Sequence, residues 1–273
     1  MKKFFYIYGK VLMVSLTSLI LIAILSIVKT DSSLTNRSLL LIQKAMMLLP
    51  VLILYRLWDK GKWDLGMVQS QKKLNLTKGA FLGFIFMTVS IVITGVLEPH
   101  RITLHNFNMQ MIVSLLYTLI LCLVVAFAEE TLFRGYIQGL VKHHYTDIAG
   151  IVFSTLFFAA MHGMNNDFSI LAFIELTLGG LFLGIVREMT QGLWFGIGFH
   201  CLWNFTQSGI FGFLQNKEEG ISVLSVIFKK NNIITGGQWG PEASIITSLV
   251  LILLIAYLRI ISYKWRKKRE VSQ

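Results

Sequence analysis

Residues 110–134 read QMIVSLLYTLILCLVVAFAEETLFR and decide the fold of this chain. The part up to residue 128 is apolar and has the length that an α-helix needs to cross a bilayer, about 20 residues. Two carboxylates, Glu129 and Glu130, follow it, and Arg134 comes one helical turn later. An ionised side chain near the bilayer centre costs roughly 2.5–3.5 kcal/mol on insertion scales. The run therefore indicates a functional site inside the membrane, and we expect its helix to continue to about Leu140.

The composition is that of a polytopic membrane protein. Of the 273 residues, 55% are hydrophobic and only 14% are charged, against about 25% charged residues in soluble proteins. This length leaves no room for a large soluble domain, so we predict one membrane domain over 1–273. The net charge of +11 fits cytoplasmic loops and anionic lipid headgroups and does not imply nucleic acid. Cys122 and Cys201 both lie in apolar segments, which argues against a disulfide framework.

The hydropathy predicts an all-α fold with eight spans, at about 8–28, 39–57, 80–97, 110–128, 146–163, 168–187, 192–213 and 243–263. Most of the 25 lysines and arginines precede the first span, lie between the second and third, or close the chain. The positive-inside rule makes that side cytoplasmic, which places both termini there. The run 58–79 is then the main cytoplasmic loop. The run 214–242 is an outer loop, and its Gly and Asn content argues against a packed domain.

The start of the chain resembles a signal peptide, with Lys2 and Lys3 before an apolar run. However, 8–28 is long for such a segment and no Ala-x-Ala site follows it, so we expect a retained helix. The chain shows no internal repeat and lacks the paired broken helices of an inverted-repeat transporter. Its charges also cluster on one side, so a transporter is the weaker interpretation.

The two adjacent glutamates are predicted to differ in role. Residues four apart share a helix face, so Glu130 and Arg134 can form an ion pair that makes their burial tolerable. Glu129 points elsewhere and meets only apolar residues at the same spacing, which leaves it available as a general base or acid. The alternative is that these charges mark a helix end in the membrane interface. That alternative accounts for Arg134, in part for Glu130, and poorly for Glu129.

Two further motifs place histidines in other apolar segments. Phe158 and His162 are four residues apart, as are His200 and Asn204. An imidazole and a carboxamide on one helix face can both donate hydrogen bonds to one oxygen atom, as an oxyanion hole requires. A histidine at a span end is also common as an interfacial residue, and His with Asn can serve as a polar contact between helices. Taken together with Glu129, the motifs supply the groups needed to hydrolyse an amide bond.

The same residues leave a metal site open as an alternative. Glu129, His162 and His200 are all possible zinc ligands, and three such ligands would leave a position for water. The chain lacks the His-Glu-x-x-His run of the common zinc helix.

Glu175 is another carboxylate inside a predicted span. It either faces the same cavity or bonds to a neighbouring helix.

The ordered motifs Glu129-Glu130-x-x-x-Arg134, Phe158-x-x-x-His162 and His200-x-x-x-Asn204 resemble those of the CPBP family. This family, also called Abi, contains the CAAX proteases and bacteriocin-processing enzymes. The resemblance covers about 110–210, and all three motifs match. It implies an eight-helix intramembrane endopeptidase of the cell membrane.

The resemblance also implies roles for individual residues. Glu129 would activate water with help from His162, and His200 with Asn204 would hold the oxyanion. Three supporting residues would be Glu130, Arg134 and Phe158. The implied mechanism is glutamate-dependent and needs no cofactor, although zinc remains possible.

The expected substrate is a membrane-associated protein or peptide, in CAAX-type or bacteriocin and leader-peptide processing. The alternative function is a non-proteolytic one, either as a membrane regulator that binds a partner or as a bacteriocin self-immunity protein. Because we expect the cytoplasmic border soon after Arg134, we predict a cavity that opens toward the cytoplasmic leaflet.

Overall fold

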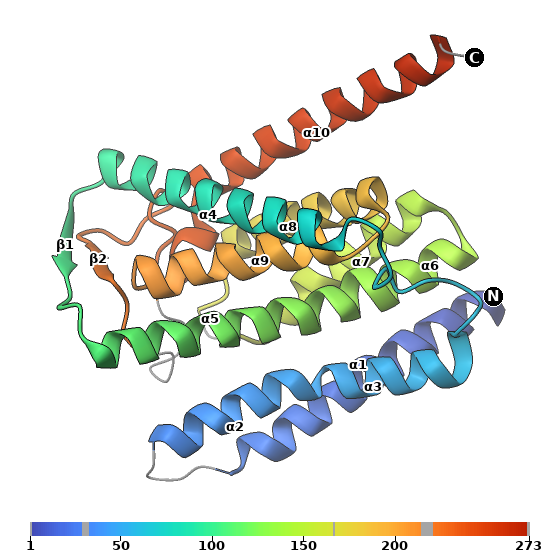
Figure 1. Cartoon of the computed structure of the whole chain (residues 1–273), viewed down its shortest axis with the longest axis horizontal. Coiled ribbons are helices and arrows are strands. Elements are labelled where there is room, and N and C mark those ends of the chain that lie inside the picture. Colours follow the sequence, from blue (N-terminus) through green and yellow to red (C-terminus); the bar gives the residue numbers. More distant parts are fainter. Residues whose placement is uncertain (1, 29–32, 166, 214–220, 272–273) are drawn as a thin grey trace.

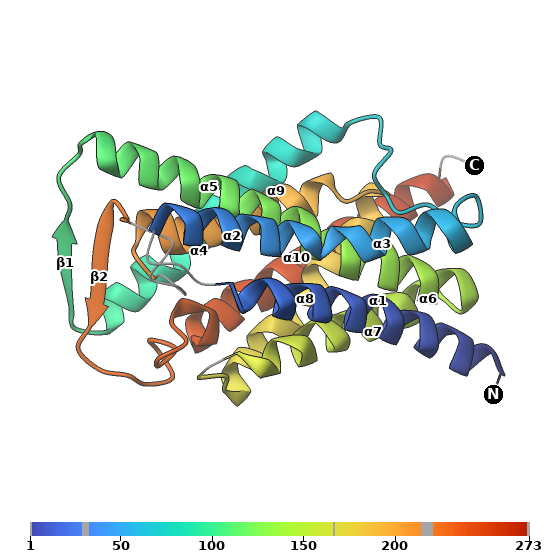
Figure 2. The same cartoon turned by 90° about the horizontal axis from the view of Figure 1, so that it is seen from below.

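The computed structural model of the chain describes residues 2–28, 33–165, 167–213 and 221–271, and it confirms the prediction of an all-α membrane protein. The helices run roughly along the long axis of the molecule, and the two ends of the chain lie at the same end of the bundle (Figures 1 and 2). Six helical segments of the described chain are long and apolar enough to cross a membrane, namely Lys3–Ser26, Thr35–Asp59, Lys72–Leu97, Met109–His144, Asp147–Met164 and Ile170–Thr190.

Helical structure lies at each of the eight predicted spans. The helices are α1 (Lys2–Ser26), α2 (Ser33–Met46), α3 (Leu48–Leu54), α4 (Lys72–Leu97), α5 (Met109–Glu130), α6 (Gln138–His144), α7 (Asp147–Met161), α8 (Ile170–Thr190), α9 (Trp194–Phe205) and α10 (Ile245–Val271). The seventh span is shorter than predicted. Helix α9 has 12 residues and continues as the π-helix Thr206–Ile210, whereas α10 has 27 residues.

Short polar side chains fix the starts of three helices. The Asn108 side chain accepts a hydrogen bond from the Met111 backbone N–H at the start of α5 (2.9 Å). Thr146 and Ser169 do the same at the starts of α7 and α8. Such caps satisfy backbone donors that the first helical turn leaves without partners. They set where each of these helices begins.

The helix that carries the glutamate pair is longer than we predicted. Helix α5 continues without a break through the π-helix Thr131–Ile137 into α6, which ends at His144. The sequence did not indicate the π-helix, which begins immediately after the two glutamates. Wide turns of this kind are frequent at functional sites. Every residue from 130 to 141 is buried.

The connections at the end of the bundle opposite the termini are more ordered than predicted. Strand β1 (His100–Leu104) pairs antiparallel with β2 (Leu224–Phe228), in a register that joins Ile102 to Val226. The two strands lie beyond the helix ends (Figure 1). The described part of 214–242, where we predicted an outer loop without a packed domain, contains strand β2 and the buried turn Pro241–Ala243.

Glycines bring α4 and α9 into direct backbone contact. A Cβ atom at Gly79 would lie 2.0 Å from the backbone oxygen of Phe195, and one at Gly83 would lie 2.2 Å from that of Phe199. On the other helix, a Cβ at Gly198 would lie 2.1 Å from the Leu76 oxygen. Small residues permit this close approach in membranes. The contact fixes the part of α9 that carries the second histidine motif.

Candidate active site

The predicted ion pair is present and lies in the protein interior. Arg134 Nη1 is 3.2 Å from Glu130 Oε1, and the two side chains are 0% and 1% exposed. The alternative of charges at a helix end in the membrane interface is therefore wrong for these two residues. Glycines leave the space that the pair occupies. A Cβ at Gly180 would lie 3.3 Å from Arg134 Nη2, and one at Gly196 would lie 3.0 Å from Glu130 Oε2.

Phe158 connects the ion pair to the first histidine motif. The Arg134 guanidinium lies 4.3 Å from the centre of the Phe158 ring, a cation–π contact. The His162 ring centre is 4.5 Å from the same ring. Phe158 thus contacts both groups.

His162 is held by the backbone of its own helix. Its Nδ1 lies 2.8 Å from the Phe158 carbonyl oxygen. A carbonyl oxygen can only accept, so Nδ1 carries a proton. In the neutral ring Nε2 then has a free lone pair, and it lies 4.0 Å from Glu129 Oε2.

His200 contacts both glutamates. Its Nδ1 lies 3.1 Å from Glu130 Oε1, and its Nε2 lies 3.8 Å from Glu129 Oε2. One oxygen of Glu129 therefore faces the Nε2 atoms of two histidines from different helices. Glu130, through its contacts with Arg134 and His200, orients the second of these rings.

All four residues predicted to be catalytic line one cavity of about 120 Å³. They are Glu129, His162, His200 and Asn204. The rest of the lining comes from α2, α5, α7, α8, the segment after α9 and the turn before α10. These lining residues are Leu40, Lys44, Thr118, Leu121, Cys122, Val125, Phe158, Asn165, Leu176, Gln207, Ser208, Phe213, Trp239 and Glu242. The fold thus brings the three sequence motifs together.

The lining residues show in which direction the cavity extends within the bundle. On α5 its lining residues run from Glu129 back toward Thr118, which is toward the start of the helix and the β1–β2 end of the bundle (Figure 1). In the other direction the helix is buried from 130 to 141. We placed the membrane border just after Arg134, whereas the helix continues to His144.

Two carboxylates adjoin this group. Glu175 is buried and lines a side cavity together with His200, Asn204 and Glu242, so it faces the site rather than only a neighbouring helix. Glu242 was not predicted at all, since it lies in what we interpreted as an outer loop. Its Oε1 accepts a hydrogen bond from Trp203 Nε1 (3.1 Å). Burial raises the pKa of Glu242.

The contact between Trp203 and Glu242 should stabilise this wall of the cavity. Trp203→Phe keeps an aromatic ring but removes the N–H donor, so we expect a loss of about 1–3 kcal/mol in the free energy of unfolding. A carboxyl whose pKa is raised in the folded state stabilises that state at low pH and loses this contribution as the pH rises through the raised pKa. The cost of Trp203→Phe should therefore grow with pH, because the charged form needs the donor more. Thermal unfolding in detergent at several pH values measures this. In Glu242→Gln the pH dependence should disappear.

These observations define a class of protein. The chain is a helical membrane protein in which a carboxylate and two histidines from separate helices line one cavity. Residues 111–206 match the family model described as type II CAAX prenyl endopeptidase Rce1-like. This match covers the core that carries the three motifs, indicates a membrane protease of the CAAX endopeptidase type and confirms the resemblance drawn from those motifs. A comparison with curated proteins found no match.

Proposed function

We propose that the chain is an endopeptidase that hydrolyses a peptide bond in a membrane-associated protein or peptide, with water activated by Glu129 and His162. The observation that supports this is the arrangement around Glu129 Oε2, with His162 Nε2 at 4.0 Å and His200 Nε2 at 3.8 Å. These distances are too long for direct hydrogen bonds and suit groups bridged by a water molecule.

The proposed reaction begins with that water. Glu129 accepts a proton from it, and the water oxygen attacks the carbonyl carbon of the scissile bond. The negative charge develops on the former carbonyl oxygen, where Asn204 donates a hydrogen bond from its amide. The proton on Glu129 then passes to the departing nitrogen, the C–N bond breaks, and a carboxylate and an amine result. A base positioned in this way contributes about 10²–10⁴-fold to the rate.

The role of His200 depends on where its protons lie. Its Nδ1 proton is directed to Glu130, so Nε2 can donate to the oxyanion only when the ring carries a second proton. Glu130 acts here as a positioning residue, and Arg134 balances its charge.

Zinc is the alternative way to activate the water. The three donor atoms Glu129 Oε2, His162 Nε2 and His200 Nε2 lie on one cavity, but their 3.8–4.0 Å separations exceed the roughly 3.3 Å between ligands of a tetrahedral zinc ion. Among the described residues, no group of three His, Cys, Asp or Glu side chains is arranged to hold a metal. A zinc enzyme would lose activity with a chelator and regain it with zinc, and the purified protein would contain about one zinc per chain.

The test compares cells that express the wild-type chain with cells that express Glu129→Gln. We expect a set of membrane-associated peptides that are shortened only in the wild type. Purified protein in lipid vesicles should cleave the same precursors, and Glu129→Gln should not. A regulator or self-immunity protein predicts the opposite result, because site variants would then restore the phenotype of a deletion strain fully without any cleavage product.

A further inference from the structure

We propose that a side cavity next to the catalytic group binds a lysine side chain of the peptide substrate, close to the bond that is cleaved. The side cavity has a volume of about 50 Å³ and is lined by residues of α7, α8, α9, α10 and the turn before α10, among them Glu175 and Glu242. The geometry of this site stands on the structure alone, whereas its role as a substrate subsite rests on the proposed proteolysis.

Glu175 is a buried carboxylate without a partner. Its residue is 3% exposed and lines the side cavity. Within the described part of the chain it makes no hydrogen bond and no ion pair, and the charged group that acts on it is a second carboxylate, Glu242. Burying a carboxylate without a donor or a counter-charge is strongly unfavourable. An ionisable residue of this kind inside a membrane protein indicates a binding site whose ligand supplies the missing partner.

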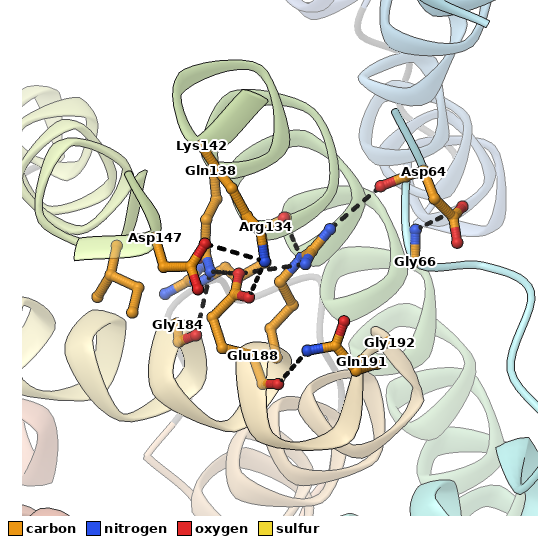
Figure 3. A network of polar contacts seen from close by, with 12 residues as sticks. Asp64, Gly66, Arg134, Gln138, Lys142, Asp147, Gly184, Glu188, Gln191 and Gly192 are labelled. Atoms are coloured by element: carbon orange, nitrogen blue, oxygen red, sulfur yellow. Dashed lines mark hydrogen bonds and ion pairs between the residues drawn. The ribbon is translucent and has the colours of Figure 1, made fainter. Parts of the chain in front are cut away.

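The other carboxylate of α8 shows that the fold can supply partners. Glu188 accepts a hydrogen bond from Gln138 Nε2 (2.9 Å) and forms an ion pair with Lys142, as Figure 3 shows. It also accepts from Arg187 Nη1 (3.2 Å). Glu175 lies on the same helix, but its carboxylate faces a cavity where Glu188 faces protein donors.

A second buried group beside the side cavity also lacks a partner. Gln207 is 3% exposed, lies in the π-helix after α9 and hydrogen-bonds to Glu242 through its side chain. Its Oε1 atom is buried, and none of the described residues donates to it. An amide oxygen and a carboxylate both accept hydrogen bonds. The unsatisfied groups on the two sides of Glu242 therefore need a ligand that donates.

The charges around the side cavity determine the sign of that ligand. Of its described lining residues, two are carboxylates, one is a histidine, and none is Lys or Arg. Lys44 lines the main cavity but not the side cavity. An anion would add to the repulsion between Glu175 and Glu242, whereas a cation compensates both carboxylates. The side cavity is therefore suited to a positively charged group.

The size and the walls of the side cavity favour lysine among the cationic side chains. An ammonium group is compact and has three N–H donors, which matches the three acceptor groups of Glu175, Glu242 and Gln207. The guanidinium of arginine is a larger, planar group with five donors. Apolar lining residues, among them Phe158 and Leu176, suit the methylene stem that carries the ammonium.

The position of the side cavity indicates which part of the substrate enters it. His200 and Asn204 line both the main cavity and the side cavity. Since Asn204 is proposed to bind the oxygen of the scissile carbonyl, a side chain in the side cavity belongs to a residue close to that bond. Glu175 and Glu242 thus act as specificity-determining residues, and they take no part in the proposed proton transfer.

Peptide binding to an inactive chain tests this site without requiring cleavage. Glu129→Gln protein in lipid vesicles is titrated with fluorescent dodecapeptides of Ala and Leu, in which each position in turn is lysine or norleucine. Norleucine keeps the stem and lacks the charge. At one position of the scan, the lysine peptide should bind about 30-fold more tightly or better, as expected for a buried charge pair. Adding Glu175→Gln should lower this ratio to about threefold or less, because one carboxylate is then lost.

The control for this titration is Glu98→Gln, the same change at a buried glutamate that does not line the side cavity, and it should keep the full ratio. Equal binding of the lysine and norleucine peptides at every position overturns the proposal. A lysine preference that survives in both Glu175→Gln and Glu242→Gln does so as well. Release of one divalent metal ion per chain by Glu175→Gln also overturns it, because a metal would then occupy the side cavity.

Thermal unfolding separates a binding role from a structural one. Without peptide, Glu175→Gln should unfold at the wild-type temperature or slightly above it, because the amide removes a buried charge that has no partner. A fall of about 4 °C or more, the shift for one lost hydrogen bond, would show that Glu175 holds the helices together and would overturn the proposal. Saturating lysine peptide should raise the unfolding temperature of the wild type more than that of Glu175→Gln.

Cleavage of the same peptides distinguishes failure of this proposal from failure of the proposed function. In the active chain, the lysine peptide should have the larger kcat/KM, and Glu175→Gln should lower the ratio of lysine to norleucine by about tenfold or more. Equal cleavage of both peptides that is lost in Glu129→Gln refutes the lysine site and leaves the proteolysis intact. Lysine-dependent binding without any cleavage that depends on Glu129 refutes the proteolysis and leaves the site intact.

Discussion

Glu129→Gln should lower the rate of peptide hydrolysis by about 10²–10⁴-fold, the usual contribution of a positioned general base. The amide has the shape of the carboxylate but cannot take the proton from water. The protein should remain folded, because the buried ion pair of Glu130 with Arg134 does not involve Glu129. The measurement is kcat/KM for a peptide identified in the cellular comparison, with purified protein in lipid vesicles and thermal unfolding recorded in parallel.

The matched control is Glu98→Gln, the same isosteric change at a buried glutamate of the β1–β2 end, where Glu98 Oε1 accepts from Asn232 (2.7 Å). Its activity should stay within about threefold of the wild type. The double variant Glu129→Gln with His162→Ala gives a further check. If the two residues act on one water, the double variant should be little slower than the slower single one, because groups that act as a unit are not additive. Fully multiplicative losses would contradict the shared role.

Much of this fold could be predicted because membranes impose a simple rule. Backbone polar groups must be satisfied within lipid, so apolar runs of sufficient length become helices. The ion pair between Glu130 and Arg134 could also be predicted, since it depends only on helical spacing. The meeting of His162 and His200 at Glu129 could not follow from spacing, because it depends on how α5, α7 and α9 pack. It was expected from the motifs as a set.

What the sequence did not indicate depends on long-range contacts. Glu242 lies far along the chain from Trp203, and nothing near it in the sequence marks it as part of the cavity wall. Strands β1 and β2 are five residues each, and more than a hundred residues of chain separate them. The extension of the cavity from Glu129 toward Thr118 was not indicated either, because it depends on where α5–α6 ends. That end lies at His144, well beyond the charges that we took to mark the membrane border.

Arg134→Met should be the most destabilising single change at the site. It leaves the Glu130 carboxylate, which is 1% exposed, without its compensating charge. Removing one partner of a buried ion pair costs about 3–5 kcal/mol. The contact with the Phe158 ring is lost as well. Reversible unfolding of the purified protein in mixed micelles gives the free energy of unfolding, and the fraction of folded protein in the membrane gives an independent measure.

Two further variants separate loss of the charge pair from loss of side-chain volume. Glu130→Gln combined with Arg134→Met removes both charges and should recover most of the lost stability, since an uncharged pair of similar volume often replaces a buried ion pair without cost. Asp147 pairs with Lys142, and its side chain is 63% exposed. Asp147→Asn should therefore lower the free energy of unfolding by at most about 1 kcal/mol. If the double variant is as unstable as Arg134→Met, packing rather than charge determines the effect. Even when folded, the double variant should hydrolyse peptides more slowly, because it replaces the carboxylate that contacts His200 Nδ1 at 3.1 Å and positions this ring.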